Sequence, residues 1–140
     1  MNSERSDAPA PAATTARALV AGHGDFAAGL VSAVEQISGR GSQLIPISVQ
    51  GLSVQDIENL LRTRMQQASV HVIFTDLQAG SCTMASRRIL RGMEDAVLIA
   101  GTNLPMLLDF VFADTLPPPE AARHAADRGR TSITVHGAGA

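Results

Sequence analysis

The stretch ALVAGHGDFAAGL, residues 18–30, sets the pattern that the rest of the chain repeats. The apolar run 18–21 has the character of a short buried strand, and Gly22-His23-Gly24 ends it. Apolar residues at helical spacing follow, so we expect a helix with Asp25 as its cap and Gly39 as its end. A strand that leads through glycines into a helix is one unit of an α/β domain.

Three more units of this kind follow along the chain. We expect strands over 44–49, 70–75 and 96–100, and helices that begin at Ser53, Ser81 and Leu104. Continuous apolar strands between helices predict a three-layer α/β/α fold whose four-stranded parallel sheet is covered on both faces. Pro46 indicates an edge strand, because proline cannot donate to a ladder. After the prolines 117–119 we expect a short helix over 120–128 and a last strand over 131–136.

The 140 residues and their 45% apolar content fit one domain with its own core. We place this domain at residues 17–140. Residues 1–16 are rich in Pro, Ala, Ser and Thr, so we expect a disordered tail that is neither a signal peptide nor an anchor. The longest apolar runs fall far short of the ~20 residues of a membrane helix. We therefore expect a soluble, cytoplasmic protein.

Composition excludes several classes of function. All eleven basic residues are Arg, so the lysine of a P-loop or of a Schiff base is missing. Aromatic residues are 3% of the chain, the net charge is −2 and the arginines are spread out, so we expect no nucleic-acid partner. Cys82 is the only cysteine, which excludes an internal disulfide and a cysteine-based metal cluster. We expect no metal and no cofactor.

Three strand exits carry small polar residues: 22–25, 75–81 and 101–103. In a right-handed parallel sheet they meet at one edge, where ligands bind. There Asp76 can hold one ring nitrogen of His23, which fixes the tautomer and leaves the other nitrogen as a nucleophile. The helix start at Gly80-Ser81 offers backbone N–H groups to a phosphoryl dianion. We expect the glycines beside His23 to leave room for a bulky donor.

The segments GHGDFAAGL (22–30), FTDLQAGS (74–81) and GTNLPMLL (101–108) resemble, in order and spacing, the mannose-class enzyme IIA family of the bacterial phosphoenolpyruvate:sugar phosphotransferase system, the PTS. The resemblance implies that His23 is phosphorylated, that Asp76 holds its ring and that the Ser81 hydroxyl lies at the phosphate seat. It also implies a homodimer that exchanges a C-terminal strand. Implied partners are the histidine phosphocarrier protein as donor, an enzyme IIB component as acceptor and, indirectly, the membrane components IIC and IID.

We assign the catalytic role to His23, Asp76 and Ser81, and phosphate or partner binding to Gly24, Gly80, Thr75 and Asn103. Cys82 departs from the family, which has proline there. Three alternatives stay open: a regulatory phosphohistidine module, a phosphoryl donor to a dihydroxyacetone kinase, and a hydrolase with a Ser/His/Asp triad. The hydrolase is disfavoured because no G-x-S-x-G nucleophile elbow is present. The sequence does not identify the sugar.

Overall fold

Four short apolar runs form one parallel sheet in the computed structural model, which describes residues 16–139. The strands are β1 (Ala18–Gly22), β2 (Leu44–Ser48), β3 (Val72–Thr75) and β4 (Val97–Ala100), in the order β2-β1-β3-β4. The predicted four-stranded parallel sheet is confirmed. β2, which contains Pro46, lies at an edge as expected.

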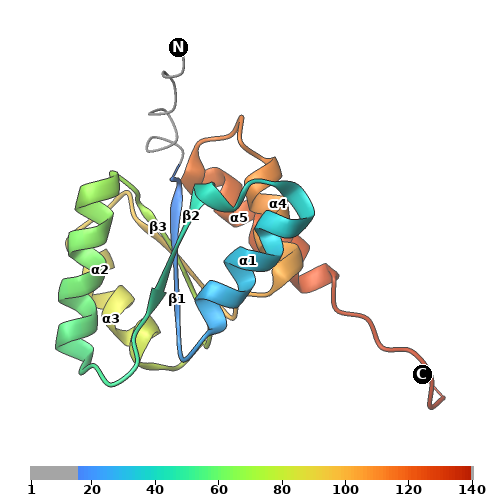
Figure 1. The fold of residues 1–140 in the computed structure, drawn as a ribbon, viewed down its shortest axis with the longest axis horizontal. Coiled ribbons are helices and arrows are strands. Elements are labelled where there is room, and N and C mark those ends of the chain that lie inside the picture. The colour runs from blue at the N-terminus through green and yellow to red at the C-terminus, as the bar shows by residue number, and fades with distance from the viewer. Residues whose placement is uncertain (1–15, 140) are drawn as a thin grey trace, which may run out of the picture.

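Helices cover both faces of this sheet (Figure 1). They are α1 (Phe26–Ser38), α2 (Val54–Ala68), α3 (Ser81–Leu90), α4 (Leu104–Phe112) and α5 (Pro118–Thr131), with a short 3₁₀ turn, η3, at Gly41–Gln43. α2 and α3 lie on one face, and α1, α4 and α5 on the other (Figure 1). The three-layer prediction is therefore confirmed. None of the described helices is long and apolar enough to cross a membrane.

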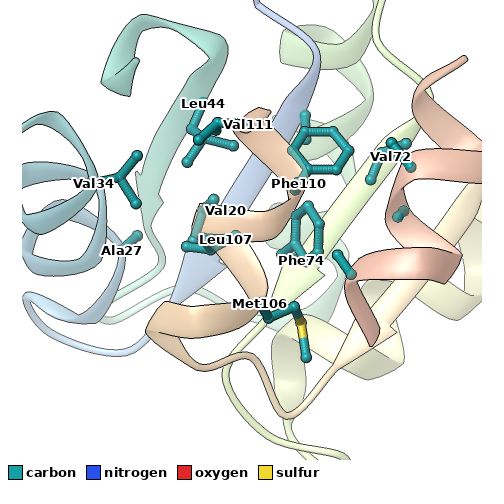
Figure 2. Close-up of a cluster of buried hydrophobic side chains, with 14 residues drawn as sticks. Val20, Ala27, Val34, Leu44, Val72, Phe74, Met106, Leu107, Phe110 and Val111 are labelled. Carbon is teal, nitrogen blue, oxygen red and sulfur yellow. The ribbon is translucent and has the colours of Figure 1, made fainter. Parts of the chain in front are cut away.

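Two buried clusters hold the layers together, because side chains alternate along each strand. Val20 and Phe74 point into the cluster under α1, α4 and α5, whereas Leu19 and Ile73 point into the one under α2 and α3. In the first cluster the rings of Phe74 and Phe110 pack edge to face, with their centroids 5.1 Å apart (Figure 2). The strands are thus buried on both faces, as the continuous apolar runs require.

The strand order changes direction between β1 and β3. From β1 the chain moves to β2 on one side and then returns to place β3 on the other side. The register pairs Ala21 with Thr75, so residues 22–23 and residue 76 leave the sheet side by side. This is the switch point at which an open α/β sheet binds ligands.

The C-terminal segment differs from its prediction. α5 continues through Arg128 to Thr131, and residues 133–136 form neither helix nor strand and are exposed. The helix extends because Gly129 packs against α4, where an added Cβ would lie 2.7 Å from the Met106 side chain. Within residues 16–139 no strand pairs with 133–136, and a strand formed only against a second copy stays a prediction. The predicted disordered tail, except for Ala16, lies outside the described residues.

Candidate functional site

His23 lies directly after β1, in a tight turn at the carboxyl edge of the sheet. The turn is closed by the N–H of Phe26, which donates to the His23 carbonyl at 3.0 Å. Gly24 has φ of +51°, a conformation that favours glycine. Asp25 is the N-cap residue of α1 as predicted, but its side chain makes no capping hydrogen bond. The His23 side chain is 57% exposed.

Asp76 lies directly after β3 and contacts His23 twice through one oxygen. The His23 Nδ1 is 2.7 Å from Asp76 Oδ2, and the His23 main-chain N–H donates to the same oxygen at 2.9 Å. The Asp76 side chain is only 9% exposed, and its Oδ1 has no hydrogen-bond partner within residues 16–139. His23 and Asp76, which we predicted to meet at this edge of the sheet, are therefore in direct contact.

The charge of Asp76 fixes the tautomer of His23. Burial alone would raise the pKa of Asp76, but the hydrogen bonds from the His23 ring and main chain outweigh burial and hold this pKa below its usual value. An ionised carboxylate only accepts hydrogen bonds, so the proton lies on Nδ1 and Nε2 carries a free lone pair. In the described chain Nε2 has no hydrogen-bond partner. In its neutral form the ring thus presents one nitrogen, Nε2, that is chemically able to act as a nucleophile.

Gly22 makes this contact possible. An added Cβ would lie 2.6 Å from the Phe26 ring and 3.0 Å from Asp76 Oδ2. We expected the flanking glycines to leave room for a bulky donor. At Gly22 the space is instead filled by Phe26 and Asp76, so this glycine permits the approach of the carboxylate to the backbone of His23.

The start of α3 lies beside the ring. A Cβ built on Gly80 would lie 3.8 Å from His23 Cε1, the ring carbon next to Nε2. Gly80 occupies the cap position, and Ser81 is the first helical residue. The helix begins at Ser81 as expected, and no side-chain hydrogen bond caps it. The free N–H groups of the first turn can receive an anion at this end of the helix.

Comparisons with known proteins agree with this geometry. The family model of the PTS system fructose IIA component matches residues 17–126. The chain belongs to the PTS IIA family. Similar solved structures include a *Streptococcus agalactiae* component EIIA (TM-score 0.72, 21% identity, 85% of this chain and 95% of that one covered). An *Enterococcus faecalis* mannose/sorbose-specific IIA subunit aligns with TM-score 0.75, 16% identity and coverage of 87% and 95%. A comparison with curated proteins gives no match.

Membership of the IIA family supports a phosphotransfer role in sugar uptake. It also implies interaction with the phosphocarrier and enzyme IIB components. Another similar structure, from *Streptococcus pneumoniae*, is a PTS IIA protein associated with a fucose utilisation operon (TM-score 0.71, 18% identity, coverage of 85% and 91%). At these identities the solved structures show the fold of this IIA chain.

Two residues assigned to phosphate or partner binding have their side chains engaged elsewhere in this IIA chain. Thr75 is fully buried, and its hydroxyl lies 2.7 Å from that of Thr83. Asn103 caps α4 by accepting from the N–H of Met106 at 3.1 Å, and its amide donates to the carbonyl of Gly129. The structure therefore brings Gly24, Gly80 and Ser81 close to the His23–Asp76 pair, and gives Thr75 and Asn103 structural bonds.

A hydrolase triad requires a hydrogen bond between the Ser81 hydroxyl and the His23 ring. Within residues 16–139 no hydrogen bond joins the Ser81 hydroxyl to the His23 ring. The neighbouring Cys82 is fully buried, and burial together with the charge of Asp76 raises the pKa of its thiol to about 11. The thiol is thus protonated and unreactive at neutral pH. α3 begins at Ser81 although Cys82 replaces the family proline.

A second histidine of the IIA chain forms a similar pair on the surface. His124, on α5, has its Nδ1 2.7 Å from Oδ2 of Asp109, on α4. Arg128 approaches the other oxygen of Asp109 at 3.8 Å. Nothing in the local sequence predicts this contact, because α4 and α5 are paired only by the fold. In the described residues no group of three or more His, Cys, Asp or Glu could hold a metal ion.

Thr83 also lies next to the site, although no sequence pattern indicates it. Its hydroxyl donates to the carbonyl of Leu77 and lies next to the hydroxyl of Thr75. A threonine inside a helix carries no signal of such a bond, since the bond depends on how the preceding loop folds back. The alternation of buried and exposed residues in α3 could at most have placed Thr83 on its buried face.

Proposed function

We propose that this IIA chain accepts a phosphoryl group on Nε2 of His23 from the histidine phosphocarrier protein. It then passes the group to an enzyme IIB component on the cytoplasmic side of the membrane, for sugar uptake through IIC and IID. The observation that carries the proposal is the hydrogen bond between His23 Nδ1 and Asp76 at 2.7 Å. This bond holds Nδ1 against the carboxylate and leaves Nε2 able to attack the phosphorus.

The transfer follows from the positions of these groups. The Nε2 lone pair attacks phosphorus as the bond from phosphorus to the nitrogen of the donor histidine breaks, and the electron pair of that bond returns to the leaving imidazole. Positive charge develops on the His23 ring and is balanced by the ionised Asp76 through Nδ1–H. The proton stays on Nδ1 throughout. Transfer to the IIB component repeats the step with His23 as the leaving group.

The phosphoryl group has a seat at the start of α3. Its N–H groups and the positive end of the helix dipole stabilise the dianion next to Nε2. We propose that Gly80 contributes its backbone there, since a side chain at this position would approach His23 Cε1. The Ser81 hydroxyl can donate to a phosphoryl oxygen, and Gly24 adds no side chain next to the ring, with nothing within 4 Å of a Cβ built on it apart from its chain neighbours.

The experiment is incubation of the chain with phosphoenolpyruvate, enzyme I and the phosphocarrier protein, followed by intact mass. We expect one acid-labile, base-stable phosphate per chain. His23→Ala abolishes it, whereas the matched control His124→Ala retains it. An undiminished mass shift in His23→Ala refutes the proposal. Addition of a IIB component, or of a dihydroxyacetone kinase in its place, shows which acceptor removes the phosphate.

We also propose that the chain forms a homodimer through residues 131–136. β4 is an open edge of the sheet, and a hollow of about 250 Å³ lies between it and α5, lined in part by Leu98, Ala100 and Ile133. This edge is unpaired in the described residues, and Ile133, which lines the hollow, and Val135 are exposed apolar side chains. Removing residues 131–140 should lower the mass measured by light scattering while phosphorylation of His23 survives. A full-length monomer at tens of micromolar concentration, or a truncated dimer, contradicts this.

A further inference from the structure

A chain of buried hydroxyl groups lies behind the loop that carries Asp76. Thr83, in the first turn of α3, is 1% exposed, and its hydroxyl donates to the carbonyl of Leu77. A threonine hydroxyl has one hydrogen, so in the 2.7 Å contact between Thr83 and Thr75 the donor is Thr75. The direction is therefore from Thr75 to Thr83 to the Leu77 carbonyl.

This chain holds the residues on both sides of Asp76. Thr75 precedes Asp76 and Leu77 follows it, and both are bonded to the Thr83 hydroxyl. Leu77 itself is exposed, as are residues 78–79, so side-chain packing contributes little to the shape of this loop. The bond from Thr83 thus replaces the packing that would otherwise fix the main chain at residue 77.

Thr75 is a firm anchor for this arrangement. Its carbonyl accepts the N–H groups of Gly101 and Thr102, each at 3.1 Å, and the Thr102 hydroxyl at 2.8 Å. These bonds join the ends of β3 and β4. Thr83 therefore connects the exposed loop after Asp76 to the hydrogen-bonded end of the sheet.

The Asp76 side chain has few constraints of its own. Oδ2 makes both contacts with His23, and Oδ1 has no hydrogen-bond partner in the part of the chain that the structure describes. Apart from the two bonds to His23, the direction of the carboxylate depends on the position of its own main chain. We propose that Thr83 is a positioning residue, whose hydroxyl fixes the main chain around Asp76 and so keeps the carboxylate on Nδ1 of His23.

This inference rests on the proposed phosphorylation of His23, and its test is chosen so that the two can fail separately. The variants are Thr83→Val, which removes the hydroxyl and keeps the shape, and Thr83→Ser, which restores the hydroxyl. Ser86→Ala is the matched control, because Ser86 is also buried in α3 but donates to the carbonyl of Cys82 at 2.7 Å, away from the loop. The first readout is the initial rate of phosphorylation by the phosphocarrier protein at equal fractions of folded chain.

The second readout needs no phosphoryl donor. The ¹⁵N signals of the His23 ring report how much of the ring carries its proton on Nδ1. In Thr83→Val we expect a shift of this population toward the Nε2–H tautomer and a rate ~10- to 100-fold lower, the size of effect expected from a displacement of about 1 Å. Thr83→Ser and Ser86→Ala should stay close to the unsubstituted chain in both readouts.

The inference is overturned if folded Thr83→Val keeps the original ring signals, or if Ser86→Ala or Thr83→Ser shifts them as much. If the unsubstituted chain takes up no phosphate, the proposed function fails, and the ring signals still decide the role of Thr83. If Thr83→Val does not fold, Thr75→Val is used in its place. This variant removes the hydrogen bond that the Thr75 hydroxyl donates to the Thr83 hydroxyl. It should move the ring signals in the same direction, and unchanged signals there also overturn the inference.

Discussion

His23–Asp76 and His124–Asp109 are joined by hydrogen bonds of the same length, 2.7 Å between Nδ1 and Oδ2, and both rings are exposed, by 57% and 61%. Their surroundings differ. His23 follows β1 and faces the start of α3, whereas His124 lies within α5 and pairs with a residue within α4. The pair at His124 has a charged neighbour, Arg128, whose guanidinium approaches Oδ1 of Asp109. The start of α3, by contrast, offers backbone N–H groups beside the His23 ring.

A histidine–aspartate hydrogen bond does not by itself mark a phosphoryl-transfer site, because this chain has two such pairs in different surroundings. The pair at His124 fastens two helices, and each of its residues belongs to a regular element. The pair at His23 joins two strand exits, where backbone N–H groups at the start of a helix are still unpaired. We therefore attribute the proposed activity to the position of the pair at the sheet edge.

The largest effect that separates the two pairs is expected from removing the carboxylate charge. Asp76→Asn should slow phosphoryl transfer to His23 by ~10²- to 10⁴-fold, because an amide cannot balance the charge of the ring and can favour the wrong tautomer. Asp109→Asn should leave the rate unchanged. Rapid-quench measurement of phosphate uptake compares them. Equal rates for the two variants would reduce Asp76 to a turn residue.

An intermediate effect is expected at the glycine next to His23. In Gly22→Ala the new Cβ meets the Phe26 ring at 2.6 Å and Asp76 Oδ2 at 3.0 Å, so something must shift. We expect a loss of about 1–3 kcal/mol in the free energy of unfolding and transfer slowed by roughly 10-fold or more. His124 is flanked by Arg123 and Ala125, which shows that the second pair needs no such glycine.

Gly29→Ala is the control for that substitution. Gly29 lies in α1 and has nothing within 4 Å of an added Cβ, so alanine should stabilise the helix by about 0.5–1 kcal/mol. Denaturant unfolding measures both variants. If Gly22→Ala is as stable and as active as Gly29→Ala, the close approach of Asp76 to residue 22 is not required.

Much of this arrangement was predictable from the sequence, for a physical reason. Periodic apolar residues report which face of an element is buried, so the strands, the helix order and the edge position of Pro46 followed from the pattern. His23 and Asp76 could be brought together because parallel strands end at one edge. The bonds of Thr83 and of Asn103 could not be predicted, since each depends on segments that meet only in the folded chain.

The end of α5 illustrates the same limit. Alternation of Ile133 and Val135 favoured a strand, and nothing in the local sequence shows that Gly129 packs on Met106 and lets the helix continue. Local pattern sets the preference of a segment, and tertiary contacts decide its length. A partner chain for residues 133–136 stays a prediction for the light-scattering experiment.

The smallest effect concerns the acidity of Asp76. Its pKa in the folded chain lies below the value of about 3.9 of an unfolded aspartate. The pair therefore adds stability that is present above about pH 4 and is lost as the pH falls through the folded pKa. A ¹³C titration of the carboxyl group measures this pKa. His23→Ala should raise it, since burial then opposes only the main-chain bond, and an unchanged pKa would show that the ring contributes nothing.

The most direct test of the central claim is the identity of the phosphorylated nitrogen. The chain is phosphorylated by the phosphocarrier protein, and ³¹P and ¹⁵N spectra are recorded before and after, with peptide mapping of the modified residue. We expect a single phosphohistidine at His23, substituted on Nε2, with its Nδ1–H still bonded to Asp76. Phosphate on Nδ1 of His23, or on His124, would contradict the account.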